Sequence, residues 1–403
     1  MQTQAIVSRL LRCCASLMHA ARWQALRDVA ESAVCGRALT LTSLALGTSR
    51  ATKVRHRVKC VDRLLANAHL DHERIDVYRA LAHAWLSDLP QLLIVVDWSS
   101  LTADLKWHWL RASVVVEGRS ITLFEEVHPR KHLAARSVHR QFIKRLAALL
   151  PPTDSPPIIL TDAGFRTPWF RMVAAQGWYW VGRTRNRDFV RRPGGRWTAA
   201  KGLYVQATTK AKDLGPYEAV RNQPLVCRFA LIKHKPTGRK HKYPSGKVKN
   251  NSSTRKIAQR YREPWLLSYS PGLAYLGASA IVKLYAQRMT IEQQFRDTKN
   301  ATLGMGLSQS KSRSQKRLQA LLLIAHIAQL AKRLIGEAAK AQQLELQLMS
   351  NNTRNRATIS VMTLATRVIE RPELLREIDD PWVHLQTLRR QATAAINNAI
   401  LGA

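Results

Sequence analysis

The sequence predicts a mixed α/β fold, in which a sheet covered by helices lies between helical segments at the two ends of the chain. Three observations lead to this fold class. Apolar residues recur every three or four positions from Ala5 to Leu89, with no proline before Pro90, a spacing typical of helices. After Pro90, short apolar runs alternate with helical stretches, which is typical of a helix-covered sheet. Beyond Asn300 the helical period returns.

The charge of the chain points to a nucleic-acid partner. Among 403 residues there are 64 Lys and Arg against 27 Asp and Glu, a formal net charge of +37. That excess exceeds what solubility requires and is typical of proteins that bind nucleic acid. With 46% hydrophobic residues, the chain can bury sizeable cores, and its length suggests two or three domains.

Cysteine usage and hydropathy indicate a cytoplasmic protein. The five cysteines form neither an even disulfide set nor a CxxC spacing, which favours a reducing cytosol. The longest apolar run, Leu318 to Leu330, is shorter than the roughly 18 residues that suggest a membrane span, so no membrane association is expected. Residues 1–27 contain four arginines and no acid, a pattern shared by transit peptides and by amphipathic first helices.

One passage of the N-terminal region resembles a helix-turn-helix. A short helix over Leu39–Leu46, a turn at Gly47 and a second helix from Arg50 to Leu65, capped by Ser49, fit the sequence. In such a motif the second helix enters the major groove of DNA, although any two helices joined by glycine have the same pattern. The candidates for recognition of DNA ends are Arg50, Lys53, Arg55 and Arg57.

The middle of the chain predicts the sheet. Continuous and alternating apolar runs predict strands, and longer periodic stretches predict helices. The expected order is β-β-β-α-β-α-β, with the first three strands in a meander. The segments are strands Leu92–Asp97, Leu110–Glu117 and Ile121–Val127, helix Ser137–Leu150, a strand from Pro157 that ends on Asp162, helix Pro168–Gln176 and strand Trp178–Arg183.

A basic insertion then interrupts the core. Residues 186–262 are rich in Gly, Pro, Lys and Arg, with short strands expected at Leu203–Thr208 and Leu225–Ile232. Between Arg228 and Arg262 there are 12 Lys or Arg and no acid, which fits a solvated loop but favours a DNA-facing insertion.

The core is expected to resume after the insertion. A strand at Trp265–Tyr269 precedes a helix that begins near Gly277, and Leu318–Leu334 is expected to form a core helix. The predicted domains are a helical DNA-end-binding domain (1–89), a core in two parts (90–185 and 263–312), the β-rich insertion between them (186–262) and a C-terminal helical domain (313–403).

Three carboxylates stand out by their positions. Asp97 and Asp162 end apolar strands, and Glu292 follows Tyr285 and Arg288 and precedes Lys299 at spacings that place all four on one face of a continuous helix. An aspartate at a strand end often only caps a loop, and a glutamate in a basic helix usually pairs with an arginine four residues away. The combination favours a metal-dependent DNA enzyme.

Magnesium suits such a set of carboxylates. Two aspartates close together repel each other unless cations lie between them, and hard carboxylate oxygens bind Mg²⁺ while leaving room for water and phosphate oxygens. Two such ions can assist phosphodiester hydrolysis and strand transfer from one site, and Mn²⁺ is a plausible substitute. Walker, GxSxG and HExxH motifs are absent from the sequence, which disfavours nucleotide hydrolysis and serine chemistry.

These residues resemble a known family. Tyr285-x2-Arg288-x3-Glu292-x6-Lys299 is similar to the YREK signature of DDE transposases of the insertion sequence 4 family, and Asp162-Ala-Gly-Phe165 resembles the segment around their second aspartate. The resemblance extends over nearly the whole chain. The segments similar to the insertion sequence 10 branch are Val95–Ser99, Leu110–Val114 and Asn352–Arg356.

The resemblance implies an RNase H-like core with Asp97, Asp162 and Glu292 as ligands of two Mg²⁺ ions. It also implies cut-and-paste transposition through a hairpin intermediate, acting on double-stranded element ends and target DNA, with a dimer in the paired-end complex. Tyr285, Arg288 and Lys299 would hold phosphates.

Two tryptophans have alternative interpretations. Trp265 matches the position where relatives stack a flipped base, but a core tryptophan in an apolar strand has the same pattern. Trp98, next to the first aspartate, is expected to be a packing residue.

Two other functions fit the same residues less well. A DNA-binding protein that no longer transposes would keep the charge, and so would an RNase H-like nuclease that cuts DNA structures without joining strands. The tyrosine and lysine around Glu292 favour the transposase.

Overall fold

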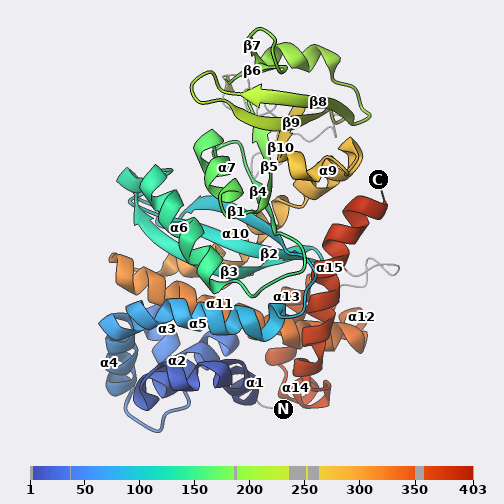
Figure 1. Cartoon of the computed structure of the whole chain (residues 1–403). Coiled ribbons are helices and arrows are strands. Elements are labelled where there is room, and N and C mark those ends of the chain that lie inside the picture. The colour runs from blue at the N-terminus through green and yellow to red at the C-terminus, as the bar shows by residue number, and fades with distance from the viewer. Residues whose placement is uncertain are drawn as a thin grey trace. The chain divides into compact units, whose positions relative to one another are not determined.

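A computed structural model describes residues 3–36, 38–185, 188–235, 251–252, 263–349 and 358–402. The chain divides into two compact units (Figure 1), one formed by Met1–Ser155 with Met289–Ala394 and the other by Pro156–Arg288 with Ala395–Ala403. The five domains predicted from the sequence remain a prediction. Most of the acid-free stretch after Arg228, and the segment Asn352–Arg356, lie outside the described residues.

The first unit combines a small antiparallel sheet with many helices, and it confirms the predicted meander. The strands pair in the order β3-β2-β1. Their bounds are β1 Leu93–Ser100, β2 Trp107–Val116 and β3 Arg119–Pro129. The helices are α1 Thr3–Leu10, α2 Ala20–Cys35, α3 Leu41–Leu46, α4 Val54–Leu65, α5 Ala68–Leu86, α6 Arg136–Leu149, α10 Met289–Lys299, α11 Gln315–Ala341, α12 Leu344–Leu348, α13 Val361–Ile369, α14 Pro372–Glu377 and most of α15 Leu385–Leu401.

Helices cover both faces of this sheet. On one face, Phe142 of α6 stacks on Phe124 of β3 with ring centroids 5.3 Å apart. On the other, Gln294 of α10 accepts a hydrogen bond from Ser113 of β2 at 2.9 Å. Because side chains alternate along a strand, each residue of the meander faces one helix layer or the other.

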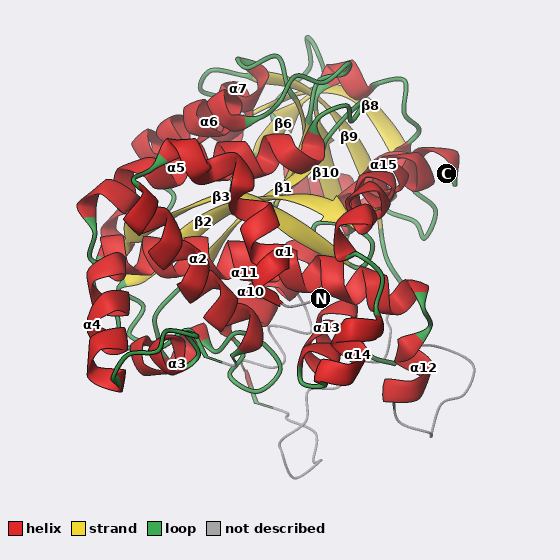
Figure 2. Cartoon of the chain, turned by 90° about the horizontal axis from the view of Figure 1, so that it is seen from below, coloured by secondary structure: helices red, strands yellow, loops and turns green. Residues whose placement is uncertain are grey.

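The long helix α11 is the core of the first unit. It packs against α2, α4 and α5 from the N-terminal region and against α13 (Figure 2). Among the described residues, it is the one helix long and apolar enough to cross a membrane, but its apolar window is completely buried inside the protein. Burial of this kind is typical of a core helix, because a membrane span would present its side chains to lipid.

The N-terminal helices confirm part of the predicted helix-turn-helix and correct its second helix. Thr40 caps α3 by accepting a hydrogen bond from the Ser43 backbone N–H, and Gly47 ends the helix. The second helix begins at Val54 rather than Arg50, and Ser49 does not cap it. Arg50 is instead held outside the helix by an ion pair with Asp28, with 2.8 Å between Nε and Oδ2.

The second unit contributes seven strands, which follow one another in the order β4-β5-β10-β9-β8-β6-β7. Only β4 and β5 pair in parallel; the other described pairs are antiparallel. The strands are β4 Ile158–Thr161, β5 Tyr179–Thr184, β6 Phe189–Arg191, β7 Thr198–Ala199, β8 Lys212–Ala219, β9 Leu225–Ile232 and β10 Trp265–Tyr269. The helices are α7 Thr167–Ala174 and α9 Ala278–Ala286, joined by the last residues of α15.

Strand positions in the insertion were only partly predicted. The strand at Leu225–Ile232 is confirmed, but Leu203–Thr208 is not a strand, since Ala200–Gln206 forms a 3₁₀ helix. Strands β6, β7 and β8 were missed. The reason is clearest in β8, where Gly215 has a φ of 81° at a register shift and Pro216 follows it. Both residues usually mark a turn, yet here they occupy an irregular strand.

The predicted continuous helix through the YREK signature is wrong. Helix α9 ends at Ala286 and α10 begins at Met289. Between them, the backbone N–H groups of Gln287 and Arg288 bond to carbonyls three residues back rather than four, which tightens the chain into a turn. The Gln287 side chain also donates to the carbonyl of Ala395 at 2.6 Å. The four signature residues therefore do not share one face of a single helix.

Candidate active site

Asp97 lies where β1 changes from buried to partly exposed. The four preceding strand residues are buried, whereas Asp97 and the three after it are half-buried. It lies opposite Arg111 in the register of β1 and β2, and Arg111 contacts Thr298 of α10. Because opposite residues of an antiparallel pair point to the same face, Asp97 faces α10. Its Oδ1 accepts a hydrogen bond from the Trp98 backbone N–H at 2.8 Å.

Helix α10 presents one face to the C-terminal half of β1. Glu292, in its first turn, is exposed, while Ile291, Gln294 and Phe295 are buried. A hollow of about 630 Å³ lies between this face and the C-terminal half of β1. It is lined by Asp97, Trp98, Ser99, Glu292, Phe295, Arg296, Lys299, Asn300 and Ser308. The residues from α10 follow the i, i+3, i+4, i+7 spacing of a helix face.

Lys299 is held at the edge of the hollow by specific contacts. Its Nζ donates to Ser99 Oγ at 2.7 Å and lies 5.7 Å from the Trp109 ring and 5.8 Å from the Phe295 ring. Burial, reinforced by the charge of Arg111, lowers the pKa of Lys299 to about 8. The lysine is therefore a cation at neutral pH that loses its proton in mildly alkaline solution.

Because the sequence predicts that Lys299 holds a DNA phosphate, DNA binding is expected to weaken above pH 8. Loss of one proton from Lys299, whose pKa is about 8, would remove this predicted phosphate partner, so the affinity for DNA should fall by at most about tenfold per pH unit. Anisotropy titrations of a labelled duplex across this range measure the slope. The Lys299→Arg variant stays charged and should lose most of that dependence; an identical slope in the two proteins contradicts the assignment.

The same pKa predicts a stability change of definite sign. The unfolded lysine keeps its proton up to about its ordinary value of 10.5, whereas the folded one loses it near 8. The free energy of unfolding should therefore rise with pH inside this window.

Polar contacts also hold the α6 face of β1. Trp98 points to the α6 face, where its Nε1 donates to His139 Nε2 at 3.0 Å and its ring meets His128 edge-on, as predicted for a packing residue. Since an indole N–H can only donate, His139 is the neutral acceptor. Burial lowers the pKa of His139 to about 4, and His128 adds to the effect.

Asp162 lies on the second unit, directly after β4. Its Oδ1 accepts a hydrogen bond from the Gly164 backbone N–H at 2.7 Å, which closes a tight turn on the carboxylate. A Cβ on Gly164 would lie 2.9 Å from that same oxygen. The glycine therefore allows the carboxylate to fold back on its own loop.

Because the sequence predicts a catalytic role for Asp162, the Gly164→Ala variant should stay folded but lose DNA cleavage. The added methyl carbon would lie 2.9 Å from Asp162 Oδ1, which is too close, so the carboxylate would have to move. A shift of about 1 Å at a catalytic group can lower the reaction rate by about 100-fold. A nicking assay measures the loss of cleavage, and a thermal unfolding curve shows whether the variant is still folded. Gly202→Ala, where a Cβ meets nothing within 4 Å, is the matched control and should cut normally. Full activity in Gly164→Ala would refute the role of this loop.

The remaining signature residues lie with Trp265 on the second unit. Tyr285 of α9 is buried, and its ring lies edge-on to Trp265 at 5.1 Å. On another side, His234 approaches Trp265 at 4.3 Å. Trp265 is half-buried, so it differs from the fully buried core tryptophans of the chain. Arg288 is half-buried at the turn after α9.

The four end-recognition candidates differ in their surroundings. Arg50 is tied to Asp28, and Arg57 donates to the carbonyls of Leu46 and Thr48. Lys53 and Arg55, by contrast, are exposed.

Comparison with known families identifies the chain. Residues 88–330, more than half of its length, match the model of the transposase DDE domain. The chain belongs to this family. All three predicted carboxylates and the other signature residues fall inside the matched region. No curated protein matches the chain.

A member of the transposase DDE domain family acts on DNA, and the hollow has donors that fit a divalent metal. Asp97 and Glu292 supply hard carboxylate oxygens from one unit, which suit Mg²⁺. Within the described ranges no three His, Cys, Asp or Glu side chains form a ready metal site. The structure thus brings Asp97, Glu292 and Lys299 together, while the inclusion of Asp162 remains a prediction.

Sequence reasoning missed several residues of this transposase site. Arg296 and Asn300 line the hollow and were detectable, because they follow Glu292 at helical spacing. Ser99, which orients Lys299, lies in the similar segment Val95–Ser99, but no sequence pattern links it to a partner 200 residues away in the chain. Arg111 lies in the similar segment Leu110–Val114, where it stands out only as a charge inside an apolar strand.

Proposed function

We propose that this chain is a cut-and-paste transposase of the insertion sequence 4 family, resembling the insertion sequence 10 branch, with an RNase H-like core. One observation carries the proposal. Asp97 and Glu292, from segments nearly 200 residues apart, line one hollow with Lys299 inside the matched transposase region. Both carboxylates line this open hollow, where their hard oxygen donors can bind a divalent metal.

The proposed reaction breaks and joins phosphodiester bonds. Water attacks phosphorus at the element end, the bond to the 3′ oxygen breaks, and that oxygen leaves as a 3′-hydroxyl after gaining a proton. The 3′-hydroxyl then attacks the opposite strand, which forms a hairpin and releases the flanking DNA. A second water opens the hairpin, and the regenerated 3′-hydroxyl attacks target DNA. Each step exchanges one phosphorus–oxygen bond for another, so no oxidant or reductant is needed.

The side chains have distinct proposed roles. Asp97 and Glu292, completed by Asp162, would hold two Mg²⁺ ions, with Mn²⁺ as a substitute. When bound, these ions supply Lewis-acid activation of the attacking oxygen and stabilisation of the leaving oxygen. Lys299, fixed by Ser99, would hold a phosphate near the cut.

The second unit would hold the distorted strand. Tyr285 and Arg288 are proposed to bind phosphates through a hydroxyl and a guanidinium group. Trp265 is proposed to stack on a flipped base, because it is half-buried rather than enclosed by the core. Stacking on an aromatic ring contributes about 1–3 kcal/mol per base.

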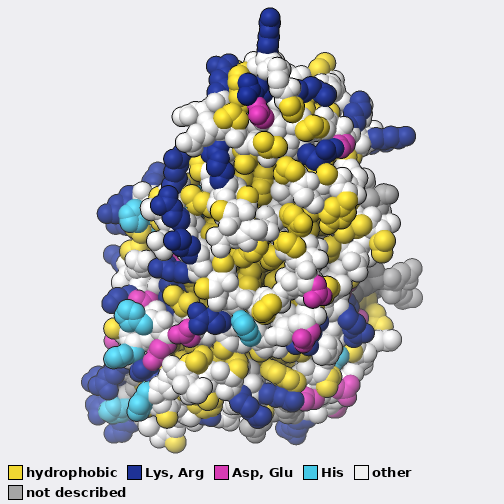
Figure 3. All heavy atoms as spheres, viewed as in Figure 1, with side chains coloured by type: hydrophobic (Ala, Val, Ile, Leu, Met, Phe, Trp, Pro, Cys, Tyr) yellow, Lys and Arg dark blue, Asp and Glu magenta, His cyan; other side chains and the backbone are white. Residues whose placement is uncertain are grey.

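Exposed cations of the first unit offer a surface for the duplex. Arg136, Arg140 and Lys144 recur every fourth residue on the solvent side of α6 and are exposed; lysine and arginine gather along this flank in Figure 3. The chain has no acid between Glu126 and Asp154. With Lys53 and Arg55 near α4, these side chains are proposed to contact element ends or target DNA in a cytoplasmic, dimeric paired-end complex.

The experiment that tests this function uses the element's own ends. Inverted repeats flanking the coding region supply the substrate, as a labelled duplex incubated with the protein and Mg²⁺. The expected products are a nick, a hairpin and a strand joined to target DNA. A mobility shift without any cutting would identify a DNA-binding protein instead. Cutting without joining of pre-cut ends would identify a structure-specific nuclease.

A further inference from the structure

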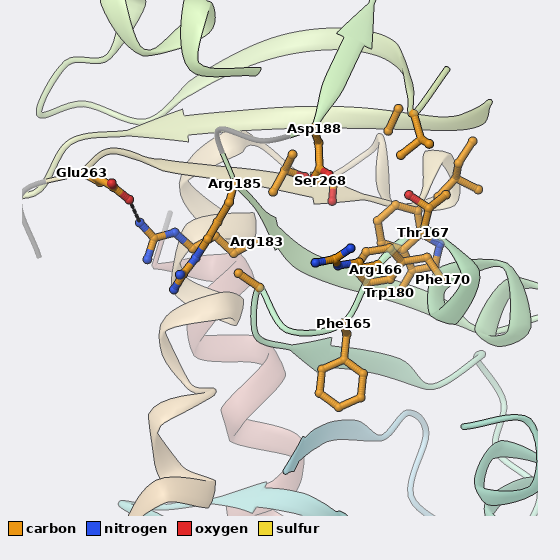
Figure 4. A pocket seen from close by; sticks show the side chains of 15 residues that line it. Phe165, Arg166, Thr167, Phe170, Trp180, Arg183, Arg185, Asp188, Glu263 and Ser268 are labelled. Carbon is orange, nitrogen blue, oxygen red and sulfur yellow. Dashed lines mark ion pairs between the residues drawn. The ribbon is translucent and has the colours of Figure 1, made fainter. Parts of the chain in front are cut away.

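The second unit contains a polar pocket beside the loop that carries Asp162. Its volume is about 630 Å³. It opens between the β4–α7 loop, the end of β5, the β8–β9 hairpin and β10 (Figure 4). The lining includes Ala163, Phe165 and Arg166, which follow Asp162 directly. The pocket is therefore adjacent in sequence to a proposed catalytic residue, but none of its residues belongs to the signature.

Three arginines and two acids give the pocket a net positive charge. Arg183 and Arg185 are two residues apart at the end of β5, while Arg166 comes from the loop after β4 (Figure 4). Glu263 lies 3.8 Å from Arg183, and the charge of Arg166 partly offsets the burial that raises the pKa of Asp188. The guanidinium groups of Arg166 and Arg185 are exposed and, among the described residues, form no hydrogen bond or ion pair.

Among the residues that the structure describes, two buried polar atoms in the neighbourhood of the pocket have no hydrogen-bond partner. Arg183 Nε and the Tyr204 hydroxyl are enclosed, yet neither has a hydrogen-bond partner among the described residues. A buried donor without a partner costs about 1–3 kcal/mol, and such groups usually mark a missing water, ion or ligand. Arg183, Arg185, Asp188 and Glu263 all act electrostatically on Tyr204, so both unpartnered atoms belong to the same charged neighbourhood.

We propose that this pocket binds a backbone phosphate of a single DNA strand, held by Arg166, Arg183 and Arg185. This inference rests on the proposed function, because it assigns a place to the strand that separates near Asp162. A guanidinium group matches phosphate oxygens with two parallel hydrogen bonds. The flexible backbone of a single strand can bend into a recessed pocket. A duplex is too stiff to do so, because its phosphates lie on the surface of a rigid helix.

The test measures binding without cleavage. A fluorescently labelled single-stranded oligonucleotide is titrated with the full chain in the absence of divalent metal, at several salt concentrations. The variants are Arg166→Gln, Arg185→Gln and the double variant. Loss of the one phosphate contact should lower the slope of log affinity against log salt by about 0.7 in the double variant, and by less in each single variant. Arg196→Gln removes an exposed arginine of the same unit outside the pocket.

The outcomes separate this inference from the proposed function. An unchanged salt slope in Arg196→Gln, with reduced slopes in Arg166→Gln and Arg185→Gln, supports the phosphate site. Equal reductions of the slope in these three single variants would mean that only the overall charge matters, and would overturn the proposed site. Nicking of the duplex end by the wild-type protein with Mg²⁺ is measured in parallel. Normal nicking with unaltered slopes rejects the pocket alone, whereas reduced slopes without any nicking reject the transposase and keep the pocket.

Discussion

Replacing Asp97 with alanine is expected to abolish strand cleavage, with a loss of at least about a thousandfold, while binding to element ends stays nearly unchanged. Asp97 supplies a carboxylate to the hollow from within β1. The strand continues to Ser100, so replacement of this one side chain should leave the fold intact. Loss of the oxygen donors removes metal binding, whereas the cations that hold DNA remain. A nicking assay and a mobility shift on the same duplex measure both quantities.

The control for this variant is another aspartate of the same hairpin. Asp104, between β1 and β2, is exposed and bonds to Thr102 and Lys106, but it does not line the hollow. Asp104→Asn should therefore cut normally. Glu292→Gln and Asp162→Ala should each behave like the Asp97 variant. Retained cleavage in Asp162→Ala would remove that residue from the site, and retained cleavage in Asp97→Ala would refute the hollow as the active site.

Strand and helix positions in the core could be predicted because burial imposes a simple pattern there. The run before Asp97 is apolar at every position, as a strand covered on both faces must be, and the observed β1 begins one residue later than predicted. It also ends three residues later, at Ser100, so the prediction that Asp97 ends the strand is wrong. Strand β10, at Trp265–Tyr269, was predicted with its correct bounds for the same reason. The helix-turn-helix was less well predicted, because nothing in residues 50–53 marks them as non-helical.

The break in the signature helix could not be predicted locally. Gln287 and Arg288 are ordinary helix formers, and neither glycine nor proline accompanies them. What distinguishes this turn is a contact from Gln287 to Ala395, more than 100 residues further along the chain. Tertiary contacts of this kind override local propensity.

The hollow contains two of the three predicted acids, Asp97 and Glu292, whereas the residues that hold its side chains in place were only partly predicted. Carboxylates at strand ends and at helical spacing are visible in a sequence, since chemistry restricts which residues can serve. The residues that hold these acids in place depend on how neighbouring strands pair. Arg111 lies opposite Asp97 and also opposite Glu125 across β2 and β3, and no spacing in the sequence reveals that a charge in an apolar strand has a buried partner.

Removing the charge of Arg111 is expected to destabilise the first unit by about 3–5 kcal/mol. Arg111 and Glu125 are both completely buried, with 2.7 Å between Nε and Oε2. Tyr78 also donates to Glu125, and the Trp109 ring lies 4.4 Å from the guanidinium carbon. In Arg111→Met, Glu125 would remain as a buried charge without its cation, so unfolding in urea should require less denaturant.

The pH dependence and a double variant identify the cause of this loss. Burial already raises the pKa of Glu125 above 4.5 against the opposing effect of Arg111; without the arginine the pKa rises further. A protein with a carboxyl group whose pKa is raised by folding becomes less stable as pH increases. Arg111→Met should therefore be least stable, relative to wild type, at neutral pH and should recover stability in mild acid.

The double variant Arg111→Met with Glu125→Gln removes both charges and keeps an acceptor for Tyr78, so it should regain more than half of the lost free energy of unfolding. The exposed pair Arg79–Asp76 is the reference, because Arg79→Met should cost at most about 1 kcal/mol. If the double variant is as unstable as Arg111→Met at every pH, lost packing rather than the unpaired charge explains the effect.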